Sequence, residues 1–117
     1  MSDVVWARPG PDNWFRLLEL NFSSIKTIGV YTVWCYGPGV NYTVRCGQGI
    51  VGARLTVHKN DPTITKHARN GTLLVTWAAV PAEFLDAVEG YLADRYRPVE
   101  GDRYPAVPRL AVNLPGA

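Results

Sequence analysis

Long hydrophobic runs, signal-like segments and a large net charge are all missing from this chain of 117 residues. A membrane-spanning helix needs about 20 consecutive apolar residues, and no stretch approaches that length. The first residues do not have the pattern of a secretory signal peptide, so a cytoplasmic location is the default expectation. A net charge of only +2 does not by itself indicate a protein that binds nucleic acid.

Cysteine is scarce as well, with two residues, Cys35 and Cys46. Their spacing matches no metal-binding motif, which excludes a cysteine-based metal site of the usual kind. We expect two buried free thiols, because disulfides are rare in cytoplasmic proteins. A structural disulfide is the alternative, since the two residues fall in neighbouring predicted strands.

The composition, with 47% hydrophobic and 19% charged residues, is typical of a single folded domain. We expect one domain over 1–117, with an N-terminal arm over 1–11, a core over 12–101 and a tail with several prolines over 102–117. No internal repeat and no low-complexity segment is present.

The charges are distributed unevenly along the chain. Residues 45–69 contain five basic side chains and one acid, whereas residues 83–102 contain six acids and two arginines. The first segment could therefore meet phosphate, and the second could hold a cation. Two ordinary solvated faces are the alternative interpretation.

Hydrophobic periodicity and turn residues predict a small α/β sandwich, in which helices flank a three-stranded and mainly antiparallel sheet. A polar, basic connection is expected over 62–71. The predicted elements are a short helix after a cap at Asp12 or Asn13, strands over 27–36 and 42–46, a helix over 50–59, a strand over 72–80 and a helix over 81–96.

Three side chains on the predicted helices are candidates for a functional site. Arg54 and His58 stand four residues apart, so they share one face of a helix. Glu89 lies at the border of the apolar stripe of the last helix. Carboxylates are rarely placed there unless they are paired or bind a cation, and the alternative is a side chain that reaches past the core into solvent.

A series of short features follows in a fixed order over residues 27–101. They are Gly29-Val30-Tyr31, Arg45-Cys46-Gly47 followed by Gln48, Arg54 seven residues after Gly47, His58, and Glu89 nine residues before Pro98. This order resembles that of the GIY-YIG nuclease superfamily, whose members cut phosphodiester bonds on a small α/β scaffold.

The resemblance implies a metal-dependent endonuclease that hydrolyses nucleic acid, with DNA expected rather than RNA. Tyr31 would be the general base or orient the attacking water; a proton relay by His58 is the alternative. Arg54 would grip the scissile phosphate, and Glu89 would hold one Mg²⁺ or another divalent cation. The expected substrate contacts are Arg45, Gln48 and Lys59.

The chain departs from the family pattern at two places. Arg45 stands where the second motif has a tyrosine, and Gly101 and Asp102 occupy the region in which the family has a late asparagine. Asn113, in the tail, is the candidate that would replace it. These departures keep a second function open, a catalytically degenerate domain that binds nucleic acid or a protein partner without cleavage.

Strand alternation raises a further question about Arg45. If Cys35 and Cys46 lie directly opposite each other, Arg45 points away from Tyr31. A register shift or a β-bulge would then be needed for Arg45 to join the site. The chain also has no room for a target-recognition domain, so specificity would come from a homodimer or a partner protein. A scaffold domain unrelated to nucleic acid is the third interpretation.

Overall fold

The computed structural model describes residues 3–101 and 104–115, which form an antiparallel sheet with helices on both faces. The sheet has four strands in the order β1-β4-β2-β3, so the expectation of three strands was wrong by one. The long hairpin β2–β3 and strand β4 correspond to the three predicted strands. The strands are β1 (Phe15–Arg16), β2 (Ile28–Gly37), β3 (Val40–Ile50) and β4 (Thr72–Ala79).

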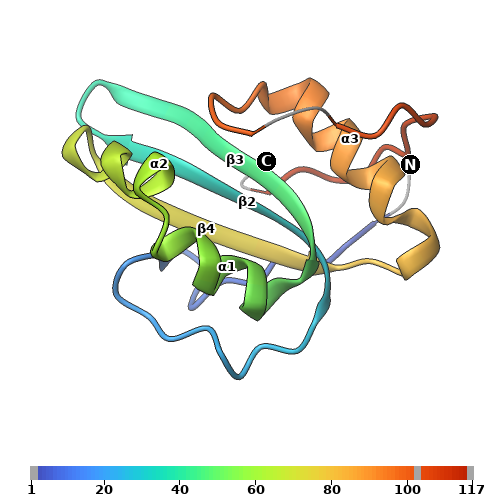
Figure 1. The fold of residues 1–117 in the computed structure, drawn as a ribbon, viewed down its shortest axis with the longest axis horizontal. Coiled ribbons are helices and arrows are strands. Elements are labelled where there is room, and N and C mark those ends of the chain that lie inside the picture. The colour runs from blue at the N-terminus through green and yellow to red at the C-terminus, as the bar shows by residue number, and fades with distance from the viewer. Residues whose placement is uncertain (1–2, 102–103, 116–117) are drawn as a thin grey trace.

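Helices cover the two faces of the sheet, as Figure 1 shows. Helices α1 (Val51–Lys59) and α2 (Pro62–Thr65) lie on one face, which we call the α1 face. Helix α3 (Leu85–Tyr96) lies on the other, the α3 face, after a 3₁₀ turn η2 (Ala82–Phe84). The α/β class and the flanking helices are therefore confirmed. Within the described part of the chain, no helix is long and apolar enough to cross a membrane.

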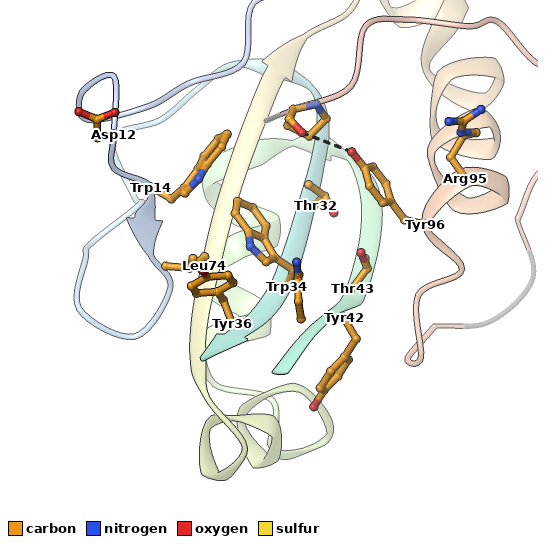
Figure 2. Close-up of a pocket in the computed structure, with 12 residues that line it drawn as sticks. Asp12, Trp14, Thr32, Trp34, Tyr36, Tyr42, Thr43, Leu74, Arg95 and Tyr96 are labelled. Atoms are coloured by element: carbon orange, nitrogen blue, oxygen red, sulfur yellow. Dashed lines mark hydrogen bonds between the residues drawn. The ribbon is translucent and has the colours of Figure 1, made fainter. Parts of the chain in front are cut away.

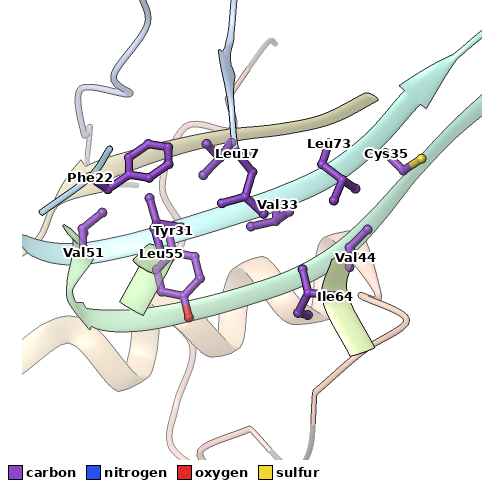
Figure 3. Packing of buried hydrophobic residues seen from close by; sticks show 11 residues of the cluster. Leu17, Phe22, Tyr31, Val33, Cys35, Val44, Val51, Leu55, Ile64 and Leu73 are labelled. Carbon is purple, nitrogen blue, oxygen red and sulfur yellow. The ribbon is translucent and has the colours of Figure 1, made fainter. Parts of the chain in front are cut away.

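Each face of the sheet has its own hydrophobic cluster. On the α1 face, Tyr31 and Val33 of β2 pack with Leu55 of α1, as Figure 3 shows. On the α3 face, Val30 of β2 packs with Val88 of α3. Successive residues of β2 therefore contribute to opposite clusters, as the alternation of a strand requires.

The segment that follows Asn13 is a strand and not the predicted short helix. Phe15 pairs with Val75 of β4, and its ring stacks on Trp77 with 4.9 Å between the ring centroids. Trp14 contacts Trp34, which belongs to the opposite face of the sheet. An extended segment can place neighbouring aromatic rings on both faces of the sheet, whereas a helix would bury only one side, so tertiary packing overrides the local preference.

The connection over 62–71 is also more ordered than expected, because it contains α2 and a 3₁₀ turn, η1 (Lys66–Arg69). The Asp61 side chain accepts a hydrogen bond of 3.0 Å from the backbone N–H of Thr63, and Pro62 occupies the first helical position. A capping acid followed by proline is a common start of a helix. The polar composition of this segment concealed that signal.

A β-bulge in β3 settles the direction of Arg45. Tyr31 pairs with Gly47 and Val33 with Arg45, but the register shifts before Trp34 pairs with Thr43. Arg45 therefore belongs to the same side of the sheet as Tyr31. The β-bulge is one of the two irregularities that the sequence required for Arg45 to join the site.

The same register separates the two cysteines. Cys35 pairs with Tyr42, and Cys46 pairs with Thr32. Cys35 belongs to the cluster on the α1 face and Cys46 to the cluster on the α3 face. Both thiols are buried and free, so the expected pair of thiols is confirmed and the cross-strand disulfide is excluded.

The segment after α3 returns to the outer edge of β3. The backbone N–H groups of Val99 and Glu100 donate to the carbonyl oxygens of Thr43 and Val44, at 3.1 and 2.8 Å. These two hydrogen bonds hold the chain beside the bulge that carries Arg45. Asp102, which with Gly101 occupies the region of the family's late asparagine, lies outside the described residues.

Candidate functional site

A hydrogen-bonded pair of Tyr31 and His58 lies between β2 and α1. The Tyr31 hydroxyl and His58 Nε2 are 2.5 Å apart, and the side chains are only 1% and 3% exposed. His58 Nδ1 is buried and has no hydrogen-bond partner among the described residues. When Nδ1 carries the ring proton, Nε2 accepts the hydroxyl proton of Tyr31.

Gly47 makes room for this tyrosine. Tyr31 and Gly47 are paired across β2 and β3, and a Cβ atom on Gly47 would overlap the Tyr31 hydroxyl and ring. Figure 3 shows the Tyr31 ring extending from β2 toward the neighbouring strand β3. Gly47, the glycine of the second motif, is thus needed so that the Tyr31 ring can lie close to the backbone of the edge strand β3.

Gly47→Ala should therefore displace the Tyr31 ring and destabilise the protein by about 2 kcal/mol, the usual cost of overpacking a core. Urea unfolding would measure the change. Gly10→Ala is the matched control, because its nearest neighbour would lie 3.8 Å from the new Cβ atom. In the background of Tyr31→Ala the same alanine should cost less, since the ring it overlaps is gone. Equal costs in both backgrounds would show that Gly47 does not seat Tyr31.

Two half-buried arginines surround the tyrosine–histidine pair. Burial raises the pKa of Tyr31, while Arg54 and Arg45 oppose this shift through hydrogen bonding and positive charge. Burial and the same two charges lower the pKa of His58 to about 4. His58 is therefore neutral at neutral pH, which leaves a lone pair on Nε2 for the Tyr31 hydroxyl. Among the described residues, neither guanidinium forms a salt bridge with an acid.

Glu89 lies on the opposite side of β3, on α3. Its Oε1 accepts a hydrogen bond of 2.9 Å from Gln48 Nε2, which also donates to Asp86 Oδ1 at 2.5 Å. Burial raises the pKa of Glu89; the Gln48 hydrogen bond lowers it, Asp86 raises it, and the charges of Arg45 and Arg54 lower it. The two arginines thus act on the carboxylate as well as on Tyr31 and His58.

The donor set around Glu89 is compatible with one Mg²⁺ ion. The described residues contain no group of three or more His, Cys, Asp or Glu side chains arranged to hold a metal. Mg²⁺ does not require such a group, because it commonly binds through one or two carboxylates, several waters and a substrate phosphate. Asp86 and Glu89, joined through Gln48, provide two carboxylates of that kind.

The structure brings together most of the predicted site residues and leaves two apart. Tyr31, His58, Arg54 and Arg45 meet on the α1 face, with Glu89 and Gln48 across the edge of β3. Lys59 instead donates to the Leu20 carbonyl and lies 5.9 Å from the centroid of the Phe22 ring. Asn113 does not return to the site, because its amide bonds both the N–H and the carbonyl of Val4.

Asp86 was missed in the sequence, although it stands one helical turn before Glu89 and faces the same way. Tyr104 was missed too: its hydroxyl donates to the Cys46 carbonyl at 3.4 Å, which places the tail against β3. The i, i+3 spacing was a usable signal for Asp86. No sequence pattern pointed to Tyr104.

Comparisons with protein-family models, with curated proteins and with solved structures found no match for this chain.

Proposed function

We propose that the protein is a metal-dependent endonuclease that hydrolyses phosphodiester bonds in nucleic acid, with DNA expected over RNA. One observation carries the proposal: the Tyr31 hydroxyl and His58 Nε2 lie 2.5 Å apart beside Arg45 and Arg54, and Gln48 of the edge strand β3 bonds the carboxylates of Asp86 and Glu89. Groups that could bind phosphate, move a proton and hold a cation therefore gather around one edge of β3. The order of the sequence motifs, which resembles that of the GIY-YIG nucleases, gives independent support.

Arg54 and Arg45 are the proposed phosphate ligands. Both side chains are half-buried, and neither has an acidic partner among residues 3–101 and 104–115. A planar guanidinium offers several N–H donors and can hold two phosphate oxygens at once. An anionic substrate would thus neutralise two positive charges that form no salt bridge with an acid among the described residues.

Tyr31 and His58 are the proposed proton-transfer pair. Tyr31 keeps its proton at neutral pH because burial raises its pKa, so it needs a base to remove that proton. His58 is neutral, and its Nε2 lies 2.5 Å from the hydroxyl. The proton of an attacking water would pass to Tyr31 as the phenolic proton moves to His58 Nε2.

Glu89, with Asp86 beside it, would hold the cation. A divalent ion there would supply positive charge opposite the phosphate oxygens and the leaving group. Gln48 donates hydrogen bonds to both carboxylates and fixes their position before any ion binds. This role differs from the substrate contact expected for Gln48 from the sequence.

The two departures from the family pattern are neighbours in space. Gly101 lies beside Arg45, and a Cβ atom on Gly101 would be 3.3 Å from a guanidinium nitrogen of Arg45. Gly101 also has φ = 117°, a conformation in which side chains are strained. Arg45 fills space that a side chain at position 101 would need. An arginine at position 45 and the absence of an asparagine at position 101 are therefore mutually compatible.

Binding without cleavage is the second candidate function, and the burial of Tyr31 favours it. The side chain is 1% exposed and its hydroxyl is bonded to His58, so water reaches the hydroxyl only if the surrounding side chains move when substrate binds. A domain that merely binds the polymer would need the two arginines and not the phenol.

Nicking of supercoiled plasmid DNA tests both functions. We expect conversion to open circles with Mg²⁺ or Mn²⁺ and none with EDTA. Salt-dependent binding to DNA without nicking at any metal concentration would support the second candidate. A protein that neither nicks nor binds DNA or RNA would contradict both.

A further inference from the structure

A second candidate site lies on the α3 face of the sheet, away from the cluster around Tyr31. A cavity of about 620 Å³ opens between β2, the segment before β1 and the end of α3. Figure 2 shows Trp34 at its centre, with Trp14 on one side and Tyr96 on the other. Its size is within the range of about 300–1,000 Å³ that is typical of ligand pockets.

Aromatic side chains follow one another along β2 on this face. Trp34 and Tyr36 are two residues apart, so they point to the same side of the sheet, about 7 Å apart along the strand. Trp14 meets Trp34 edge to face, with 5.0 Å between ring centroids and 84° between ring planes. Tyr36 is 54% exposed, although large aromatic side chains are normally covered. The row thus offers aromatic surface that the described residues leave uncovered.

The charges around the cavity favour an anionic ligand. Arg95 of α3 is exposed and lines the cavity, and the Arg8 guanidinium lies 4.0 Å from the centroid of the Trp14 ring. Asp12 is the one acid in the lining among the described residues. Asp94, next to Arg95 in sequence, is already paired with Arg109 at 2.8 Å. Among the described residues, Arg95 and Asp12 are the charged side chains of the lining, and Arg8 adds a second positive charge beside Trp14.

We propose that this cavity binds an unpaired stretch of nucleic acid, whose bases stack on Trp34 and Tyr36 while its phosphates meet Arg95 and Arg8. Bases present flat faces on a flexible anionic backbone, and aromatic rings along a sheet with basic side chains at the rim suit both features. The choice of nucleic acid rests on the proposed function. The single-stranded form rests on the cavity alone, because the rings can stack only on unpaired bases.

Such a site would deepen the proposed function by naming the form of the substrate. The Tyr31 cluster belongs to the α1 face and the edge of β3, whereas the aromatic row belongs to the α3 face. Because the segment after α3 occupies the edge of β3 beside Thr43 and Val44, a strand held on the α3 face would have to pass to the other face near Gln48 and Glu89. The preferred substrate would then be nucleic acid with a single-stranded segment beside the bond that is cut.

Fluorescence anisotropy of a labelled oligothymidylate of twelve nucleotides tests the proposal, with a duplex of equal length for comparison. We expect tighter binding of the single strand and quenching of tryptophan fluorescence as it binds. Tyr36→Ala should weaken binding about tenfold, since stacking of one base contributes about 1–3 kcal/mol. Arg95→Ala should reduce the slope of log K against log salt by about 0.7. Phe84→Ala, which removes an exposed aromatic ring outside the cavity, should change neither value.

Equal binding of single strand and duplex, or an unchanged affinity in Tyr36→Ala, would overturn the proposal. Tighter binding of a proline-rich peptide than of the oligonucleotide would also overturn it and assign the cavity to a protein partner. Tyr36→Ala and Arg95→Ala change exposed side chains, so both variants are expected to fold, and thermal unfolding verifies it. Binding is measured in EDTA, where no cleavage is expected, so loss of single-strand binding overturns the cavity whereas loss of plasmid nicking in Mg²⁺ overturns the nuclease.

Discussion

Glu89→Gln is expected to lower the rate of Mg²⁺-dependent plasmid nicking about 10³-fold. The substitution keeps the size of the side chain and its hydrogen-bonding capacity, but removes the negative charge that would attract the cation. A loss of that size corresponds to about 4 kcal/mol of transition-state stabilisation, within the range for removal of one electrostatic element from an active site. Initial rates at saturating Mg²⁺ would measure it.

Glu83→Gln provides the matched control. Glu83 belongs to the same acidic segment but is exposed in the turn η2, where no hydrogen bond to Gln48 is formed. Its rate should stay within about twofold of wild type, since exposed charges contribute little. Asp86→Asn should fall between the two, because Asp86 shares the Gln48 amide with Glu89. A rate for Glu89→Gln equal to that of Glu83→Gln would exclude the metal site at Glu89.

The stability of Glu89→Gln provides a second measure of the same residue. Burial and Asp86 both raise the pKa of Glu89, so its charge is unfavourable in the folded protein without a cation. The uncharged variant should consequently be no less stable than wild type in EDTA. Added Mg²⁺ should raise the unfolding temperature of wild type only, because the ion binds the folded state.

The predictable half of the site comes from residues close in sequence. Arg54 and His58 share a helix that begins directly after β3, so the hairpin and α1 fix their position relative to Tyr31 over a short length of chain. Alternation along β2 then determined which face Tyr31 occupies. Glu89 could be singled out because its place at the border of an apolar stripe conflicts with the hydration of a carboxylate.

The unpredictable half depends on contacts between distant segments. The bulge that turns Arg45 toward Tyr31 adds one residue to β3, and a sequence pattern with period two cannot reveal where it falls. The bonds of Val99 and Glu100 to β3 likewise follow from the path of the tail. The fourth strand was missed for a related reason, because Phe15 and Trp14 find their partners in β4 and β2.

Acidification should weaken folding through His58, and the sign follows from its pKa. The pKa is lowered from 6.5 to about 4 in the folded protein, by burial first and by Arg45 and Arg54 next. Between these pH values the unfolded chain binds a proton that the folded protein does not bind. Stability therefore rises with pH in this window, and the contribution of neutral His58 is lost as the pH falls from about 6.5 to about 4.

The expected loss is about 3 kcal/mol, because each unit of pKa corresponds to about 1.36 kcal/mol. Urea unfolding at pH 7.0, 5.5 and 4.5 would measure it in wild type and in His58→Gln, which keeps a polar group beside Tyr31 without titrating. The other histidine, His67, and all carboxylates are present in both proteins, so the difference between their pH profiles isolates His58. We expect wild type to lose more stability than the variant below pH 6.5. Parallel profiles would mean that His58 is protonated as easily in the folded state as in the unfolded chain, and would contradict the lowering of its pKa by burial and by the two arginines.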